Sequence, residues 1–239
     1  MIELQHLTVG YGEQAVLSDI NQTLEAGRLV CLLGSNGVGK STILRTLAGF
    51  LPPLSGKVLL EGRDLHSLSV SQRSRAVSVV LTERVEVPYM KVKDLVGMGR
   101  SPYTGFFGTL GEEDRKIVAE AIEMVGIADL AERTIDTLSD GERQKALLAK
   151  ALAQQTPVIL LDEPTAFLDF HAKASTLRLL LRLAHETNKT ILLSTHDVEM
   201  AIRLSDVLWI VQDGLILTGT TASLSESGIL QEFLQGGVL

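Results

Sequence analysis

The chain has 239 residues, 45% of them hydrophobic, and a formal net charge of −7. This acidic balance argues against a nucleic-acid partner, because nucleic-acid-binding domains usually present a basic surface. The single cysteine, Cys31, excludes an internal disulfide and is expected to be a buried thiol. Apolar runs fall far short of the roughly 20 residues that cross a bilayer, and the N-terminus does not resemble a signal peptide. We therefore expect a cytoplasmic protein with one large domain, or a core with an inserted subdomain.

The N-terminal region is predicted to be β-structure. Apolar residues alternate over residues 2–9, a pattern typical of a half-buried strand. A turn is predicted at 10–12, followed by strand over 15–17 and 20–24. Tyr11 lies in this region, and the local pattern by itself indicates an ordinary tyrosine at the end of a strand.

The next segment carries the strongest motif in the chain. A buried-strand pattern at 29–33 precedes it, and a helical pattern over 41–48 follows it. The residues between them match the phosphate-binding loop G-x-x-x-x-G-K-[ST] at every required position: Gly34, Ser35, Asn36, Gly37, Val38, Gly39, Lys40 and Ser41. We expect the glycines to let backbone N–H groups converge on an anion at a helix N-terminus.

The polar residues of this loop pattern have chemical tasks. Lys40 is expected to reach the β- and γ-phosphates, and the Ser41 hydroxyl is expected to ligate Mg²⁺. Thr42, which follows in the predicted helix, is included in the nucleotide site. The loop is therefore predicted to bind a nucleoside triphosphate.

Beyond the loop helix the pattern alternates between strands and polar segments. A break with two prolines over 49–56 leads to a strand at 57–60. Residues 64–75 are polar and indicate a loop with a short helix, and 77–81 is a second buried strand.

The character of the chain changes after this strand. Residues 83–88 are charged and contain a proline, which is incompatible with a central strand. Helical periodicity then dominates, with helices predicted over 92–98, 112–125 and 141–153. These features indicate a helical insert inside an α/β chain.

The α/β pattern resumes near residue 158. Strands are predicted at 158–161, 190–194, 207–211 and 215–218, with helices over 170–187 and 197–204 and short helices beyond 221.

Two of these strands end in residues suited to phosphoryl transfer. The strand at 158–161 ends in Asp162 and Glu163. Asp162 is predicted to hold the Mg²⁺ shell, and Glu163 to polarise the attacking water as general base. His196 follows the strand at 190–194, and a residue at the carboxyl end of a parallel strand faces the ligand crevice. We therefore assign His196 to the catalytic site.

Taken in order, these motifs resemble the ATP-binding-cassette ATPases, and the resemblance covers nearly the whole chain. The stretch just before the strand at 158–161 resembles the family signature Leu-Ser-Gly-Gly-Gln: Leu138, Ser139, Asp140, Gly141 and Glu142. Residues 167–169 resemble the D-loop, which ends in Asp169. His196 resembles the family's switch histidine, and Tyr11 resembles the aromatic residue that stacks on adenine.

The resemblance implies an α/β fold with a P-loop NTPase (RecA-like) core, an N-terminal antiparallel β-subdomain and an inserted α-helical subdomain. On this division, residues 1–82 and 154–239 form the core with the β-subdomain, and residues 83–153 form the helical subdomain. It also implies a head-to-tail homodimer with two ATP molecules. Each ATP is held between the loop of one subunit and the signature of the other.

Three positions depart from the family pattern. The signature has Asp140 where a glycine is usual, and Glu142 where glutamine is usual. Glu83 stands at the place of the Q-loop glutamine, which ligates Mg²⁺ and senses the membrane partner. A carboxylate is also a hard oxygen ligand, so Glu83 is predicted to approach the Mg²⁺ of bound ATP.

The segment from Gly97 to Tyr103, with the two phenylalanines that follow, resembles the subgroup serving iron-siderophore, haem and vitamin B12 importers. This implies two polytopic permease subunits, a solute-binding protein acting indirectly outside the cell, and a place on the inner face of the membrane. A groove lined from residue 83 to 103 would receive the permease. Tyr103, Phe106 and Phe107 are predicted to form an exposed anchor, and the alternative is a loop folded onto its own helices.

Other functional classes of cassette ATPase fit this sequence less well than an importer does. Soluble cassette ATPases that act on ribosomes or DNA usually have tandem cassettes or long inserted arms, and exporter cassettes are usually fused to a membrane domain. This chain has a single cassette and an acidic charge. A pure nucleotide-binding switch is disfavoured by Glu163. The solute itself is not encoded in this chain, because recognition belongs to the other subunits.

Overall fold

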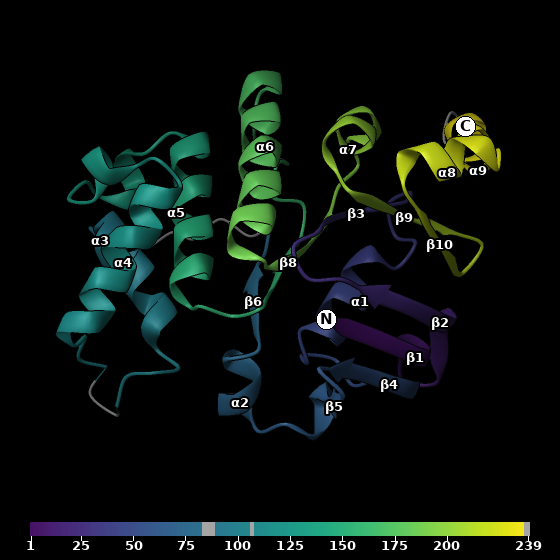
Figure 1. Cartoon of the computed structure of the whole chain (residues 1–239), viewed down its shortest axis with the longest axis horizontal. Coiled ribbons are helices and arrows are strands. Elements are labelled where there is room, and N and C mark those ends of the chain that lie inside the picture. The colour runs from purple at the N-terminus through teal and green to yellow at the C-terminus, as the bar shows by residue number, and fades with distance from the viewer. Residues whose placement is uncertain (83–88, 106–107, 237–239) are drawn as a thin grey trace.

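The computed structural model describes residues 1–82, 89–105 and 108–236. Two β-sheets occupy its centre, one four-stranded and one six-stranded. A group of helices stands at one end of the molecule, and the C-terminal helices stand at the other (Figure 1). In the described part of the chain, no helix is both long and apolar enough to cross a membrane.

The six-stranded sheet has the strand order β10-β9-β3-β8-β7-β6. Its strands are β3 (Leu29–Leu33), β6 (Val77–Val80), β7 (Val158–Leu161), β8 (Thr190–Ser194), β9 (Val207–Gln212) and β10 (Leu215–Gly219). All neighbours are parallel except β10, which runs antiparallel to β9. Every residue of β3, β7 and β8 is buried, as continuous apolar strands require when both faces are covered.

The two faces of this sheet belong to separate hydrophobic clusters. Leu29, Cys31 and Leu33 pack on one face, while Val30 and Leu32 pack on the other. Cys31 is buried as predicted, and burial raises the pKa of its thiol to about 12. Each fully buried leucine contributes roughly 1.5–3 kcal/mol, so the two layers fix the sheet firmly between them.

The four-stranded sheet is antiparallel, in the order β2-β1-β4-β5. It consists of β1 (Ile2–Tyr11), β2 (Gln14–Leu24), β4 (Ser55–Leu60) and the short β5 (Arg63–Asp64). The predicted turn at 10–12 is placed too early, because β1 continues through Tyr11, which pairs with Gln14. Gly10 belongs to the hairpin instead: a Cβ there would lie 2.0 Å from the Gln14 carbonyl oxygen. Only residues 12 and 13 turn.

Helices cover both sheets. Those nearest the sheets and the C-terminus are α1 (Lys40–Leu47), α2 (Val70–Ser74), α6 (Phe170–Thr187), α7 (Val198–Leu204), α8 (Thr221–Glu226) and α9 (Ile229–Gly236). The helices α3 (Val92–Gly97), α4 (Glu112–Met124) and α5 (Asp140–Ala153) form a separate group beyond α6 (Figure 1). Their buried residues join the same hydrophobic cluster as β7, β8 and α6, so this group is fixed to the sheet by a continuous apolar core.

A cluster of polar contacts around Arg100 joins the segment after α3 to the start of α4 and the end of α5. Arg100 is buried, and its guanidinium donates to Asp114 Oδ1 at 2.9 Å, to the Ala153 carbonyl at 2.8 Å and to Gln155 Oε1 at 2.9 Å. The hydrogen bond from Arg100 is the main reason that the pKa of Asp114 lies below its usual value. A buried guanidinium with this many acceptors is well satisfied.

Tyr103 is more constrained than the predicted anchor. The centre of its ring lies 4.1 Å from the guanidinium carbon of Arg100 and 5.0 Å from that of Arg75, and its hydroxyl donates to the Gln154 carbonyl at 3.0 Å. The side chain is therefore folded onto its own chain, with one part left at the surface. Phe106 and Phe107 lie outside the described residues. The predicted strand at 77–81 also ends one residue early, and Leu81 is exposed.

Candidate active site

The predicted phosphate-binding loop connects β3 to α1 at the carboxyl edge of the six-stranded sheet. Gly37 and Gly39 have φ angles of +80° and +115°, which favour glycine. A Cβ on Gly39 would also lie 2.6 Å from Val16, so this position needs glycine for space as well. No side chain caps the start of α1, which leaves its positive N-terminal end directed at the loop.

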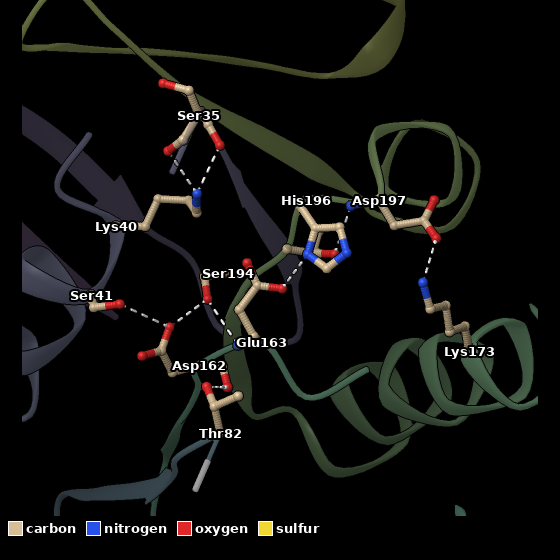
Figure 2. A network of polar contacts seen from close by, with 12 residues as sticks. Ser35, Lys40, Ser41, Thr82, Asp162, Glu163, Lys173, Ser194, His196 and Asp197 are labelled. Atoms are coloured by element: carbon tan, nitrogen blue, oxygen red, sulfur yellow. Dashed lines mark hydrogen bonds and ion pairs between the residues drawn. The ribbon is translucent and has the colours of Figure 1, made fainter. Parts of the chain in front are cut away.

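Lys40 lies folded into this loop. Its side-chain ammonium donates to the carbonyl oxygens of Gly34 at 2.7 Å and Ser35 at 2.9 Å (Figure 2). The residue is buried, and desolvation lowers the pKa of the ammonium, while the charges of Glu163 and Asp162 oppose that shift. An ammonium held among carbonyls in this way can exchange them for phosphate oxygens without crossing open solvent.

Asp162 links the loop helix to two strands. Its Oδ1 accepts from the Ser194 hydroxyl at 2.7 Å and from the Ser41 hydroxyl at 3.3 Å (Figure 2). The Thr82 hydroxyl donates to the backbone carbonyl of Asp162 at 2.7 Å. Residues from the ends of β6 and β8 and from the start of α1 therefore meet at Asp162, two of them at its carboxylate.

Glu163 follows in a constrained backbone conformation. Its φ angle of +49° lies in the left-handed region, which costs a non-glycine residue on the order of 1–3 kcal/mol. The backbone N–H donates to the Ser194 hydroxyl at 2.9 Å, and Oε2 lies 2.8 Å from His196 Nδ1. The backbone of Glu163 is thus fixed by Ser194, and its carboxylate is oriented by His196.

Ser194 is a positioning residue that our reading of the sequence missed. Its one hydroxyl accepts from the Glu163 backbone N–H and donates to Asp162 Oδ1, so it fixes the Asp162 carboxylate relative to the Glu163 backbone. Thr82 was missed too. The sequence signal for Ser194 was weak: it is a hydroxyl residue at the end of an apolar strand, directly before Thr195 and His196.

The oxygen atoms of Ser41 and Asp162 fit a divalent cation of the Mg²⁺ type. Mg²⁺ is usually bound by one or two protein oxygens together with substrate phosphates and water, rather than by an all-protein cage. Consistent with this, the described residues contain no cluster of three or more His, Cys, Asp or Glu suited to a metal. Glu83, predicted as a further ligand, lies outside the described residues.

A cavity of about 680 Å³ opens beside the loop. Loop residues Gly34, Ser35, Asn36 and Val38 line one side, His196 lines another, and α9 closes the far side. A space of this size is typical of small-molecule sites. Tyr11 is not among the lining residues and stands at the end of β1, about half exposed.

The predicted signature lies at the start of α5, on the helical group. Ser139 caps the helix, and Glu142 reaches back to it in a capping box. Leu138 is buried and fixes the entry of the chain into the helix. A Cβ on Gly141 would be 3.9 Å from Ala172, so the start of α5 lies against the start of α6. The hydrogen bonds of Ser139 and Glu142 join them to each other rather than to Lys40 or Glu163.

Asp169, at the end of the predicted D-loop, caps α6 by accepting from the Ala172 N–H at 2.8 Å. One turn into that helix, Lys173 pairs with Asp197 at 3.5 Å, which ties α6 to the segment after His196 (Figure 2). Through this ion pair, the helix that follows the predicted D-loop contacts the residue that follows His196.

Comparison with known proteins places this geometry in a family. The family model described as ABC transporter matches residues 17–166. The chain is 37% identical over 236 residues to the iron(3+)-hydroxamate import ATP-binding protein of Bacillus subtilis, covering 98% of this chain and 87% of that protein. It is 34% identical over 213 residues to the ferric enterobactin transport ATP-binding protein of Escherichia coli, covering 89% and 79%.

A solved structure agrees in fold. A bacterial ABC transporter cassette determined as a dimer matches with a TM-score of 0.77 and 27% identity, over 92% of this chain and 99% of that one. The same cassette is also known in a post-hydrolysis state with ADP and phosphate. The predicted P-loop fold is therefore confirmed, and the chain belongs to the ABC transporter family as an ATP-hydrolysing cassette.

Proposed function

We propose that this chain is the ATPase subunit of an importer for a metal chelate, such as an iron-siderophore, haem or cobalamin. The observation that carries the catalytic part is the connected set of Asp162, Glu163, Ser194 and His196 beside the phosphate-binding loop. The transported class is supported by the names of relatives that import hydroxamate-bound iron, enterobactin-bound iron and cobalamin.

In the proposed mechanism, Lys40 leaves the Gly34 and Ser35 carbonyls and binds the β- and γ-phosphates of ATP. Ser41 and Asp162 would hold Mg²⁺, which neutralises phosphate charge. Glu163 takes a proton from the water that attacks the γ-phosphorus, and the bond to the β–γ bridging oxygen breaks to release ADP. His196 holds the Glu163 carboxylate in the orientation for this transfer.

The chain is proposed to work as a head-to-tail homodimer. Each ATP would lie between the loop of one copy and Ser139 and Gly141 of the other, with Tyr11 against adenine and Asp169 near the subunit boundary. The exposed position of Tyr11 and the location of Ser139 on a separate helical group support this arrangement. Residues 83–153 would then form the helical subdomain, and the remainder the core.

The proposed assembly includes two polytopic permease subunits on the cytoplasmic face of the cell membrane, with a solute-binding protein acting from outside. A solved relative of this fold is described as part of a multi-subunit ABC transporter complex, which supports a membrane partner. A soluble ABC ATPase and a subunit of a different importer or exporter are the competing functions. Co-purification of a polytopic permease with the tagged chain would separate the first of these from our proposal.

The catalytic proposal is tested with Glu163→Gln. The amide keeps the shape of the side chain but is a poor proton acceptor, so hydrolysis should fall by about 10²–10⁴-fold. ATP binding should be retained, and the protein should accumulate as an ATP-bound dimer because closure precedes the chemistry. Turnover and gel filtration with ATP and Mg²⁺ measure both. A variant that remains monomeric and turns over at the wild-type rate would overturn the role of Glu163.

A further inference from the structure

The signature serine already has a charged partner on its own chain. One carboxylate oxygen of Glu142, Oε2, accepts from the Ser139 hydroxyl at 2.8 Å and from the Ser139 backbone N–H at 2.8 Å. The Ser139 hydroxyl oxygen in turn accepts from the Glu142 N–H at 3.3 Å. A serine hydroxyl can donate one hydrogen bond, and here the acceptor is the Glu142 carboxylate.

This arrangement affects any anion that approaches the start of α5. A free helix N-terminus attracts phosphate through its unpaired N–H groups and its dipole. Here the Glu142 carboxylate accepts from two donors at the helix start, the N–H and the hydroxyl of Ser139, and Asp140 adds a second carboxylate in the same turn. The hydrogen bonds from Ser139 keep the pKa of Glu142 below its usual value, so the carboxylate is ionised at neutral pH.

We propose that Glu142 is a positioning residue that holds the Ser139 hydroxyl away from ATP until the γ-phosphate on the second copy displaces it. The inference rests on the proposed homodimer. In this form of the signature, dimer closure must break the hydrogen bond between Ser139 Oγ and Glu142 and bring two like charges together. Closure therefore needs more ATP than it would with the neutral glutamine of the family pattern.

The displaced carboxylate has cations within range. The charges of Arg133 and Lys145 already act on Glu142, and Lys145 lies one turn further along α5. A rotation of the Glu142 side chain toward Lys145 would free the Ser139 hydroxyl and keep the carboxylate paired. The backbone of the helix start need not change.

The test uses Glu142→Gln in a Glu163→Gln background, where closed dimers accumulate. The amide oxygen can still accept from the Ser139 N–H, so the helix cap is kept while the charge is lost. The ATP concentration at half-maximal dimer formation should fall about fivefold, the order expected for one like-charge pair near a protein surface. Light scattering or gel filtration measures dimer formation. Binding of a fluorescent ATP analogue to the monomer and the melting temperature should not change.

Asp140→Asn is the matched comparison, because it removes a charge from the same turn while leaving Glu142 on Ser139. Its shift should be clearly smaller than that of Glu142→Gln. An equal shift would overturn the competition for Ser139, and so would an unchanged or raised ATP requirement in Glu142→Gln. If the Glu163→Gln parent fails to dimerise with ATP at any concentration, the proposed homodimer fails instead, so the two failures are distinguishable.

Discussion

The carboxyl edge of the six-stranded sheet and the start of α5 are both assigned to ATP, yet their side chains find partners in different ways. At the sheet edge, Asp162 and Glu163 contact residues from three other elements, including Ser194 and His196. At the start of α5, Ser139 and Glu142 contact each other across a single helical turn. The polar side chains of the first region are held by partners elsewhere in the fold, whereas those of Ser139 and Glu142 are held by a local cap. In the proposed homodimer, we therefore expect the cap to rearrange when the second copy binds.

Removing Lys40 should slow hydrolysis more than the changes at Ser194 and Arg100 described below. Lys40→Ala deletes the ammonium that is buried in the loop, and the loss of such a preorganised donor typically costs about 10²–10³-fold in rate. ATP should also bind more weakly, because a point charge on the phosphates is gone. Turnover and nucleotide titration of the purified variant measure the two effects, with Lys57→Ala on the exposed face of β4 as control. Unchanged turnover would contradict the loop assignment.

The sheet edge was largely predictable from the sequence, whereas the contacts that tune it were not. The continuous apolar strands before Gly34 and Asp162 predict buried parallel strands, so their ends must meet at one edge. Ser194 escaped notice because its role depends on two backbone segments that only the folded sheet brings together. The turn predicted at 10–12 was placed too early for a related reason, since Gly10 allows a close approach between strands that no local pattern reveals.

Ser194→Ala should have the next largest effect. Losing the hydroxyl leaves the Glu163 N–H without its acceptor and lets the two acids shift relative to each other. We expect turnover to fall about tenfold, since small misplacements of reacting groups are costly, and stability to fall by about 1–3 kcal/mol. Thr82→Val is the control, because that hydroxyl donates to the Asp162 backbone carbonyl and not to the backbone N–H of Glu163. If both variants slow turnover equally, Ser194 has no special part in positioning Glu163.

A mixed dimer tests whether the start of α5 acts across the subunit boundary. Ser139→Arg should block closure over ATP without weakening nucleotide binding by the monomer. In a dimer of one Ser139→Arg chain and one Lys40→Ala chain, one site carries both lesions and the other carries neither. Two affinity tags isolate the mixed species for a turnover assay. We expect hydrolysis at the intact site, whereas complete inactivity would mean that Ser139 serves the loop of its own chain.

The smallest effect on hydrolysis is expected at Arg100, although its effect on stability is large. Arg100→Met removes three hydrogen bonds at the base of the helical group and leaves Asp114 without its guanidinium partner. We expect the free energy of unfolding to fall by about 2–4 kcal/mol, with turnover per folded molecule unchanged. Arg115→Met, an exposed change in the same helical group, should cost less than about 0.5 kcal/mol.

The contribution of the Arg100–Asp114 contact to the free energy of unfolding should depend on pH. Because Arg100 lowers the pKa of Asp114 from 3.8 in the folded state, this contribution is fully present above pH 3.8 and is lost as the pH falls through the lower folded pKa. Urea unfolding of wild type and Arg100→Met at neutral pH and below pH 3.8 should therefore show a gap that narrows in acid. A gap that stays constant would mean that Arg100 stabilises the helical group through packing and backbone contacts alone. A fall in turnover that matches the fall in stability would show that the helical group and the sheet edge do not respond independently.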